Sequence, residues 1–354
     1  MATEVAIRAR DRLKWRERKP IQLALLLTAL ALAALVSASV GAVSLPLGAI
    51  IAGLFNPSHA LTATERTILL TIRLPRILAA AMVGSALSTS GLLFQGLFRN
   101  PLADPYVIGS SGGAVLGASI GVFLLSPISI AGFGASTLLA IVGAACSILL
   151  VYALANVRGR TPIVTLLLAG FAVSTMLSYS SYFLEVLDRD FGSGMRVLAS
   201  WLHGTIMQPT WPQLGIVGGM LALGLCASAP LARRLNALAL GDEYAAQLGI
   251  HVQQMRIAII VIGSVLTAAA VSLGGLISFV GLIVPHMTRI VLGPDHVRLL
   301  PVTAVAGALF LLIADTAART IIAPAEVPVG VLTACVGGPF FLYLLRKAKA
   351  EAFL

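Results

Sequence analysis

The residues able to do chemistry are few and widely scattered in this 354-residue sequence. Its histidines lie far apart in the chain, at His59, His203, His251, His286 and His296. None belongs to an HExxH motif, and no paired carboxylates fall inside an apolar stretch, so the sequence encodes no recognisable zinc site or acid–base pair. We therefore expect neither catalysis nor a bound metal in this chain.

The lysines, and the ionisable residues within apolar stretches, indicate which energy sources this chain could use if it were a transporter. The sequence has only Lys14, Lys19, Lys347 and Lys349, none of them after a glycine, so it lacks a phosphate-binding GxxxxGK[ST] loop. Asp315, His286 and Arg289 lie toward the ends of their apolar stretches. This placement disfavours, without eliminating, a carrier driven by a proton or sodium gradient alone.

The elements that position these residues are predicted to be membrane helices. Apolar residues make up 58% of the chain and charged residues 11%, and the mean hydropathy is +0.97. Charge-free stretches exceed the roughly 20 residues that a helix needs to cross a bilayer, and the alternating pattern of a membrane barrel is absent. The predicted fold class is an all-α integral membrane protein.

Ten spans are predicted, with a break at Gly274-Gly275 that divides one long apolar stretch into two short spans. The expected domains are a basic tail (1–20), a membrane domain (21–345) that includes a connecting segment (233–256), and a C-terminal tail (346–354). We favour a retained first span over a cleaved signal peptide, because its apolar part is too long for such a peptide. The spans are 21–43, 72–97, 106–125, 135–156, 163–184, 212–231, 257–273, 276–292, 299–319 and 327–345.

The basic residues predict the orientation of this arrangement. With the N-terminus inside, 18 of the 24 Lys and Arg residues fall on the inner side and 6 on the outer side, as the positive-inside rule requires. The net charge of +10 is therefore attributed to membrane orientation. Nucleic acid is not an expected partner, because basic stretches interleaved with aromatic residues are missing.

Two small-residue features concern packing. Gly109, Gly113, Gly117 and Gly121 recur at four-residue intervals and predict one smooth helix face for close packing inside a bundle. Cys146, Cys226 and Cys335 lie in apolar stretches without paired spacing, so we expect inert, buried thiols and no disulfide.

The segment "LALGDEYAAQLGI" (238–250) predicts a short helix on the inner side, between the sixth and seventh spans. Apolar residues recur every four positions along one stripe, whereas two acids fall in the first turn and a glycine stands at each end. A helix lying on the lipid surface usually carries basic residues, so a soluble protein partner is the better interpretation. The residues concerned are Leu240, Tyr244 and Leu248 in the stripe, Asp242 and Glu243 in the first turn, and Gly241 and Gly249 at the ends.

Four long motifs resemble those of the FecCD family, the permease subunits of type II ABC importers for ferric siderophores, haem and cobalamin. They are "RLPRILAAAMVGSALSTSGLLFQGLFRNPLADPYVIGSSGGA" (73–114), "LALGDEYAAQLGI" (238–250), "GGLISFVGLIVPHMTRIVLGPDH" (274–296) and "EVPVGVLTACVGGPFFLYLL" (326–345). They occur in the order and near the spacing of the family, and the resemblance covers almost the whole chain after the N-terminal tail.

The resemblance implies the ten-helix permease fold of these importers and a set of partners. These are a second copy of the permease, two cytoplasmic ATPase subunits that bind ATP and Mg, and a periplasmic substrate-binding protein. The chain itself binds no cofactor in this interpretation. It would lie in the bacterial inner membrane, among lipid, with both termini in the cytoplasm.

The resemblance also implies roles for individual residues. Segment 241–249 corresponds to the coupling helix of the family, which contacts the ATPase. The arginines that dock the binding protein correspond to Arg73, Arg76 and Arg319, although their simpler role would be to reach lipid headgroups. The inner gate corresponds to Ile163 and Val164, where some relatives carry hydroxyl residues.

The cargo is expected to be an iron chelate, with haem preferred over a ferric siderophore or cobalamin. Side chains able to contact haem iron fall near the predicted outer mouth, where they are also ordinary interfacial residues: Tyr179, Tyr182, His203 and Met207. Two other functions stay open at this point. One is a stand-alone proton-coupled carrier, and the other is a scaffold without transport.

Overall fold

The chain folds into a bundle of helices in the computed structural model, which describes residues 19–41, 43–55, 62–125, 128–156, 161–187, 193–206, 208–323 and 325–352. Its first helices are α2 (Lys19–Ser39), α3 (Leu47–Phe55) and α5 (Ala63–Thr67). A π-helical turn, η1 (Ile68–Arg73), continues α5 directly into α6 (Leu74–Phe98). The basic tail at 1–18 lies outside the described residues, and Lys19 and Pro20 already belong to α2.

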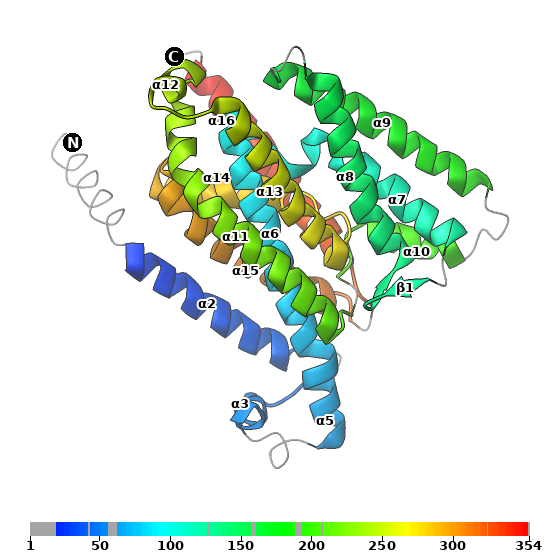
Figure 1. The fold of residues 1–354 in the computed structure, drawn as a ribbon. Helices are drawn as coiled ribbons and strands as arrows, with labels where there is room; N and C mark the ends of the chain where they lie inside the picture. The colour runs from blue at the N-terminus through cyan, green and yellow to red at the C-terminus, as the bar shows by residue number, and fades with distance from the viewer. Residues whose placement is uncertain are drawn as a thin grey trace.

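The middle of the chain forms a second group of helices. It comprises the 3-10 turn η2 (Pro105–Ile108), α7 (Ser110–Leu124), a two-stranded hairpin of β1 (Ser129–Ile130) and β2 (Phe133–Gly134), α8 (Ala135–Ala155), α9 (Ile163–Leu187) and α10 (Ser193–Leu202). The strands pair antiparallel, Ser129 with Gly134 and Ile130 with Phe133. Helices α7, α8 and α9 lie together on one side of α6 (Figure 1).

The remaining helices return to α6. They are α11 (Trp211–Ala239), α12 (Asp242–Gln247), α13 (Val252–Gly274), α14 (Val280–Leu292), α15 (His296–Thr320) and α16 (Val329–Ala352). Helix α11 continues through Ala239, so residues 240–251 connect it to α13, and α16 continues through Ala352. The predicted limits of the connecting segment (233–256) and of the C-terminal tail (346–354) refer to the membrane surface and stay predictions.

Among the described residues, seven helices are long and apolar enough to cross a membrane. Shorter apolar helices, Ser110–Leu124, Val280–Leu292 and Val329–Tyr343, stand where three further spans were predicted. The helical membrane fold is confirmed, and the count of ten spans stays a prediction. The break at Gly274-Gly275 is confirmed, because α13 ends at Gly274 and Gly275 has a φ of 65°.

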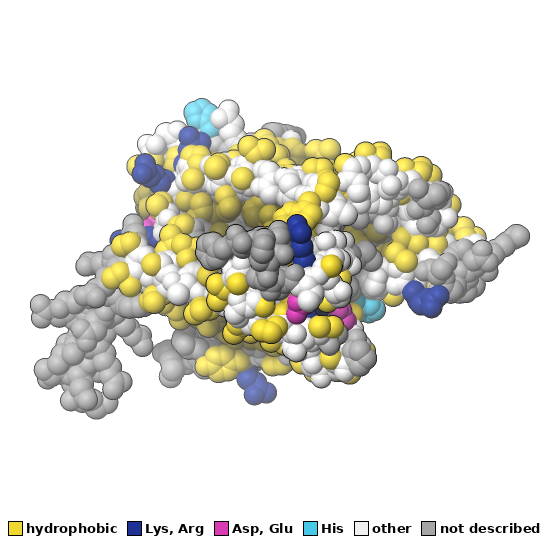
Figure 2. Space-filling model, turned by 90° about the horizontal axis from the view of Figure 1, so that it is seen from below, with side chains coloured by type: hydrophobic (Ala, Val, Ile, Leu, Met, Phe, Trp, Pro, Cys, Tyr) yellow, Lys and Arg dark blue, Asp and Glu magenta, His cyan; other side chains and the backbone are white. Residues whose placement is uncertain are grey.

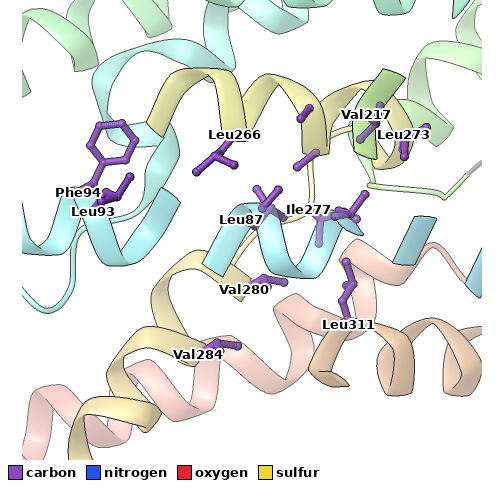
Figure 3. Close-up of a cluster of buried hydrophobic side chains, with 14 of the residues drawn as sticks. Leu87, Leu93, Phe94, Val217, Leu266, Leu273, Ile277, Val280, Val284 and Leu311 are labelled. Carbon is purple, nitrogen blue, oxygen red and sulfur yellow. The ribbon is translucent and has the colours of Figure 1, made fainter. Parts of the chain in front are cut away.

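Helix α6 is the centre of the bundle. In its most apolar 18-residue window 83% of residues are buried, against 17% in α2 and in α9. Apolar side chains of α6, including Leu87, Leu93 and Phe94, face Leu266 on α13 and Val284 on α14 (Figure 3). Helices at the edge of the bundle instead expose apolar side chains, as expected where the neighbour is lipid or another membrane subunit.

Glycines allow the backbones of the central helices to approach closely. A Cβ added to Gly91 would lie 1.8 Å from the carbonyl oxygen of Gly281 on α14, and one at Gly84 would lie 2.1 Å from that of Gly307 on α15. On α7, a Cβ at Gly117 would lie 1.9 Å from the Leu139 oxygen on α8. The predicted packing of the α7 glycine stripe is therefore confirmed.

Hydroxyl groups join the same helices at depth. Ser88 donates to the carbonyl of Thr303 on α15 over 3.0 Å, and Ser90 donates to that of Gly263 on α13 over 2.8 Å. Interhelical hydrogen bonds of this kind stabilise membrane bundles, because a hydroxyl left unpaired in an apolar environment is costly. We infer that α6, α13 and α15 form a rigid unit.

The three cysteines are free thiols on the surface of the chain, at Cys146, Cys226 and Cys335. The expectation that they are buried is wrong, because all three are exposed on this chain. In a membrane helix, side chains that face lipid are as apolar as those that face the protein interior. A cysteine within an apolar stretch of sequence is therefore not necessarily buried in the protein.

Candidate functional site

Two polar regions lie at opposite ends of α6. We call them the α12 end, where α6 finishes and α16 also ends, and the α5 end, where α6 begins (Figure 1). A helix of 25 residues is roughly 37 Å long, so the two regions are separated by about the thickness of a bilayer with its headgroups.

At the α12 end, the predicted short helix is present. Helix α12 has six residues, begins after Gly241, which has a φ of 130°, and is followed by Gly249, with a φ of 77°. Both glycines hold backbone conformations that other residues rarely adopt, which explains why the helix is so sharply bounded. Asp242 and Glu243 lie in its first turn, as the sequence predicts.

The apolar stripe of this segment faces away from the bundle. Leu240, Tyr244 and Leu248 are 62–68% exposed, whereas Ala245 on the opposite side of α12 is completely buried. A cluster of large apolar side chains on a polar connecting segment is typical of a protein contact. The outward position of the stripe agrees with the predicted partner surface.

The two acids of α12 have different surroundings. Glu243 is exposed, but the carboxylate of Asp242 pairs with Arg99 at the end of α6 and with Arg256 on α13. The coupling roles predicted for Asp242 and Glu243 stay predictions, and Asp242 is in addition bound within the chain. Arg99 and Arg256 were not singled out from the sequence, because 143 positions separate Arg99 from its acid.

The α5 end carries a cluster of charged residues around Asp315, whose side chain is completely buried. One carboxylate oxygen accepts from Arg76 over 3.0 Å, and the other accepts from Arg319 over 3.1 Å. Arg76 also pairs with the half-exposed Glu326 over 2.7 Å, and Arg319 donates to the hydroxyl of Ser37 on α2 over 2.7 Å. This cluster joins α2, α6 and α15.

Arg73 is bound to a different part of the chain. It lies at the end of η1, is 5% exposed, and donates to the backbone carbonyls of Ala38 and Ser39 at the end of α2 and of Val43 beyond it. Arg319 is similarly buried, at 9% exposed. The guanidinium groups of Arg73 and Arg319 are bonded within the chain, and their predicted role in docking stays a prediction.

A hollow of about 210 Å³ opens beside these arginines. It is lined by Gly41, Val43, Ile68, Ile72, Arg73, Arg76, Arg319, Ala323 and Glu326. Where it is described, the surface at the α5 end carries mostly hydrophobic and uncharged side chains, with few charged ones among them (Figure 2). Around the hollow, Arg73, Arg76 and Arg319 outnumber Asp315 and Glu326, which leaves a surplus of positive charge. This surplus is compatible with a docking carboxylate, and the docking itself stays a prediction.

The predicted gate and cargo residues are mostly exposed on this chain. Ile163 and Val164 form the start of α9, where Val164 is exposed and Ile163 half-buried. Tyr179 and Tyr182 project from α9, and His203, just after α10, is also exposed. Met207 lies outside the described residues. The predicted roles of all these residues stay predictions.

Among the described residues, no group of three or more His, Cys, Asp or Glu side chains has the arrangement of a metal site.

Comparison with known proteins identifies the family. The model of the FecCD transport family matches residues 27–347. The chain belongs to this family. It is 39% identical over 340 residues to the hemin transport system permease protein HmuU of Yersinia pestis, covering 95% of this chain and 98% of that protein.

Other relatives carry different names. The cobalamin import system permease protein BtuC of Halobacterium salinarum is 44% identical over 289 residues, covering 82% of this chain and 76% of that protein. A solved structure of a metal-chelate type ABC transporter in an inward-facing conformation superposes with a TM-score of 0.81 at 30% identity, covering 93% of this chain and 99% of that one.

Membership has direct consequences. The chain is a multi-pass membrane permease of the ABC transporter class and not an enzyme, and permeases of this family work with ATPase subunits and a substrate-binding protein.

Proposed function

We propose that this chain is the membrane subunit of an ATP-driven importer that moves an iron chelate from the periplasm to the cytoplasm by alternating access. The observation that carries this proposal is the exposed stripe of Leu240, Tyr244 and Leu248, which lie just before, within and just after a short helix at one end of the bundle. The sequence has no ATP-binding loop of its own, so this segment is the place where a nucleotide-binding partner would act.

The ATPase subunits would hold ATP and Mg and receive α12 in a cleft. An exposed stripe of three large apolar side chains has the size of a contact hot spot, and the exposed Glu243 beside it adds a charge for orientation. This role implies that the α12 end faces the cytoplasm. Both chain termini would lie on that side, and the membrane would be the bacterial inner membrane, as the bias of basic residues also favours.

The α5 end would then face the periplasm and the substrate-binding protein. Of the three arginines predicted to dock that protein, Arg76 is the most accessible, and its partner Glu326 is half-exposed. A carboxylate from an approaching protein would compete with Glu326 for the same guanidinium. Arg73 and Arg319 would contribute positive charge from inside the hollow.

Two copies of the chain would enclose the pathway. The edge helix α9 supports this arrangement, because Phe171, Met176 and Tyr179 expose large apolar or aromatic surface along it. An exposed apolar face inside a membrane does not by itself require a partner. The predicted gate at Ile163 and Val164 would stand at the cytoplasmic start of this helix.

We infer haem as the first cargo to test, followed by a ferric siderophore and cobalamin. The relative named as a hemin permease aligns over nearly the full length of both chains, whereas the cobalamin permease aligns over 76% of its own length. Tyr179, Tyr182 and His203 supply side chains able to contact iron from exposed positions.

A stand-alone proton-coupled carrier is the competing function, and Asp315 argues against it. This buried carboxylate is bonded to Arg76 and Arg319 at once. Both of its oxygens are occupied by guanidinium groups of the same chain, so this carboxylate serves to hold helices together. An importer without ion coupling has no need of a proton relay.

Reconstitution in proteoliposomes tests the proposal. The permease, its ATPase subunits and its binding protein are combined, and uptake of haemin, ferric citrate and cyanocobalamin is measured with ATP or with an imposed proton gradient. We expect uptake of one of these compounds only with ATP hydrolysis. Uptake driven by the proton gradient without the ATPase would overturn the proposal.

A further inference from the structure

The carboxylate of Asp242 joins α12 to two other helices. Its Oδ1 accepts from Arg99, the residue that ends α6 in a left-handed conformation with a φ of 50°. Its Oδ2 accepts from a terminal nitrogen of Arg256 on α13 over 2.5 Å. One side chain in the first turn of α12 therefore fixes that helix to both α6 and α13.

Arg256 extends this connection to a fourth helix. Its other terminal nitrogen donates to the backbone carbonyl of Thr161 over 2.9 Å. Thr161 is 2% exposed and lies two residues before α9 begins at Ile163. The same guanidinium group thus holds α12 on one side and the entry to α9 on the other.

Gln253, one turn before Arg256 on α13, strengthens the hold on Thr161. It donates to the hydroxyl of Thr161 over 2.9 Å and to the hydroxyl of Tyr152 on α8 over 3.0 Å. Both the backbone and the side chain of Thr161 are consequently bound to the first turns of α13. The connection between α8 and α9 cannot shift at this point without moving α13 or breaking these bonds.

The chemistry of arginine explains how Arg256 can hold two helices at a fixed distance. A guanidinium group presents several N–H donors in one rigid plane, so it can hold two acceptors at a fixed distance, whereas a lysine ammonium is a point charge on a flexible stem. Both bonds of Arg256 are charge-assisted, and its side chain is only 14% exposed, which limits screening by water.

We propose that Asp242, Arg256 and Thr161 form a relay that delivers a displacement of α12 to the start of α9. Arg256 is the positioning residue at its centre. The inference rests on the proposed function, because it assumes that an ATPase moves α12. It adds the specific route by which that movement reaches the helix that carries Ile163 and Val164.

Two variants and one matched control test the relay. Arg256→Gln removes the positive charge and the paired hydrogen bonds to Asp242 and Thr161. Arg256→Lys keeps the charge but lacks the planar guanidinium group that can hold two acceptors at once. Arg298→Gln is the control, because Arg298 lies in the first turn of α15 and forms an ion pair with Asp295 three positions earlier. All three are assembled with the ATPase and binding-protein subunits and compared with the unmodified complex.

The first readout is hydrogen exchange of residues 161–166 with and without ATP and vanadate, which needs no cargo. We expect nucleotide trapping to change their exchange in the unmodified complex and in Arg298→Gln, and to change it much less in both Arg256 variants, while 241–249 responds in all four. A merely structural role would lower the stability of Arg256→Gln without separating the two segments. An undiminished response at 161–166 in a folded Arg256 variant would overturn the relay.

The second readout is haemin uptake per ATP hydrolysed, or uptake of whichever of the three compounds the unmodified complex transports. We expect Arg256→Gln to hydrolyse ATP with about tenfold less uptake per ATP, a loss comparable to one charge-assisted hydrogen bond. Asp242→Asn combined with Arg256→Gln should be no worse than the more damaging single change, because both interrupt one series of contacts. Additive losses would contradict a single relay.

These measurements separate the two proposals. If the unmodified complex shows no ATP-dependent uptake, the proposed function fails. If it transports normally and Arg256→Gln keeps full uptake per ATP, the relay fails while the importer stands.

Discussion

Asp315 shows how a single residue organises one end of the protein. It is completely buried and shared between Arg76, from the start of α6, and Arg319, one turn later on its own helix. Its spacing of four positions from Arg319 is visible in the sequence and could have indicated that pair. The bond to Arg76 spans 239 positions and depends on the packing of α6 against α15, which no local pattern reports.

We predict that Asp315→Asn destabilises the protein by about 3–5 kcal/mol, because two buried guanidinium groups would lose their shared counter-charge. Glu326→Gln is the matched control, since it removes the half-exposed partner of the same Arg76 and should cost about 0–1 kcal/mol. Thermal unfolding of both variants in detergent measures the difference. Equal stabilities would show that Asp315 is not the centre of the cluster.

At the scale of elements, α12 combines a rigid attachment with an exposed face. We predict that Leu248→Asp weakens binding of the ATPase subunits by about tenfold or more, because the change places a charge in the apolar stripe. The stability of the permease alone should change by less than about 0.5 kcal/mol, since Leu248 is exposed. Co-purification with the ATPase measures the effect.

Gln247→Asp provides the control for that experiment. Gln247 is also exposed on α12 but lies off the stripe, so the same charge there should leave assembly close to normal. If both variants assemble equally well, the stripe is not the contact surface.

The contact of α6 with α14 gives a second test at this scale. Gly91→Ala would place a Cβ 1.8 Å from the Gly281 oxygen, so we predict that it destabilises the bundle by about 1–3 kcal/mol or more. Gly219→Ala on α11 is the control, because nothing lies within 4 Å of a Cβ there. In a helix that change should be neutral or favourable by up to about 1 kcal/mol. Thermal unfolding in detergent distinguishes them.

The elements differ in how far the sequence predicts them. Hydropathy and the positions of glycines can be read from a short stretch of sequence. These signals correctly located α12 and the break between α13 and α14. Other features depend on neighbours distant in the chain. The joining of α5 to α6 through a π-helical turn and the hairpin of β1 and β2 carry no strong local pattern and were not predicted. Helix α10 was also missed, although its sequence is amphipathic.

At the scale of the whole molecule, the proposed orientation can be tested with reporter cysteines. We predict that Gln247→Cys on α12 reacts with a membrane-impermeant thiol reagent only from the cytoplasmic side, and that Thr64→Cys on α5 reacts only from the periplasmic side. Both positions are exposed. The native Cys146, Cys226 and Cys335 are replaced first, because all three are exposed.

Intact and permeabilised cells provide the comparison for this experiment. Labelling of Gln247→Cys in intact cells would invert the proposed orientation and remove the basis for an ATPase contact at α12. The prediction is a physical one, because it follows from the excess of arginines on one side of the predicted spans.

The sequence was sufficient to predict the family of the whole chain but not the surroundings of individual site residues. Long motifs near the ends of α6, at α12 and across α13 to α16 were sufficient to assign the family, which the comparisons confirm. They were not sufficient to tell an open arginine from a bound one. Arg73 carries the same charge in sequence as Arg76, yet it is bound to three backbone carbonyls at the end of α2 and beyond it.

The central position of α6 has a mechanical consequence. This helix starts beside the arginine hollow and finishes at Arg99, which pairs with Asp242 of α12. The backbone of α6 packs directly against the backbones of α14 and α15, so α6 has little freedom to bend or shorten. We expect it to move as one rigid body that tilts or rotates. Probes at its two tips would keep a constant separation through the working cycle while their angle to α9 changes.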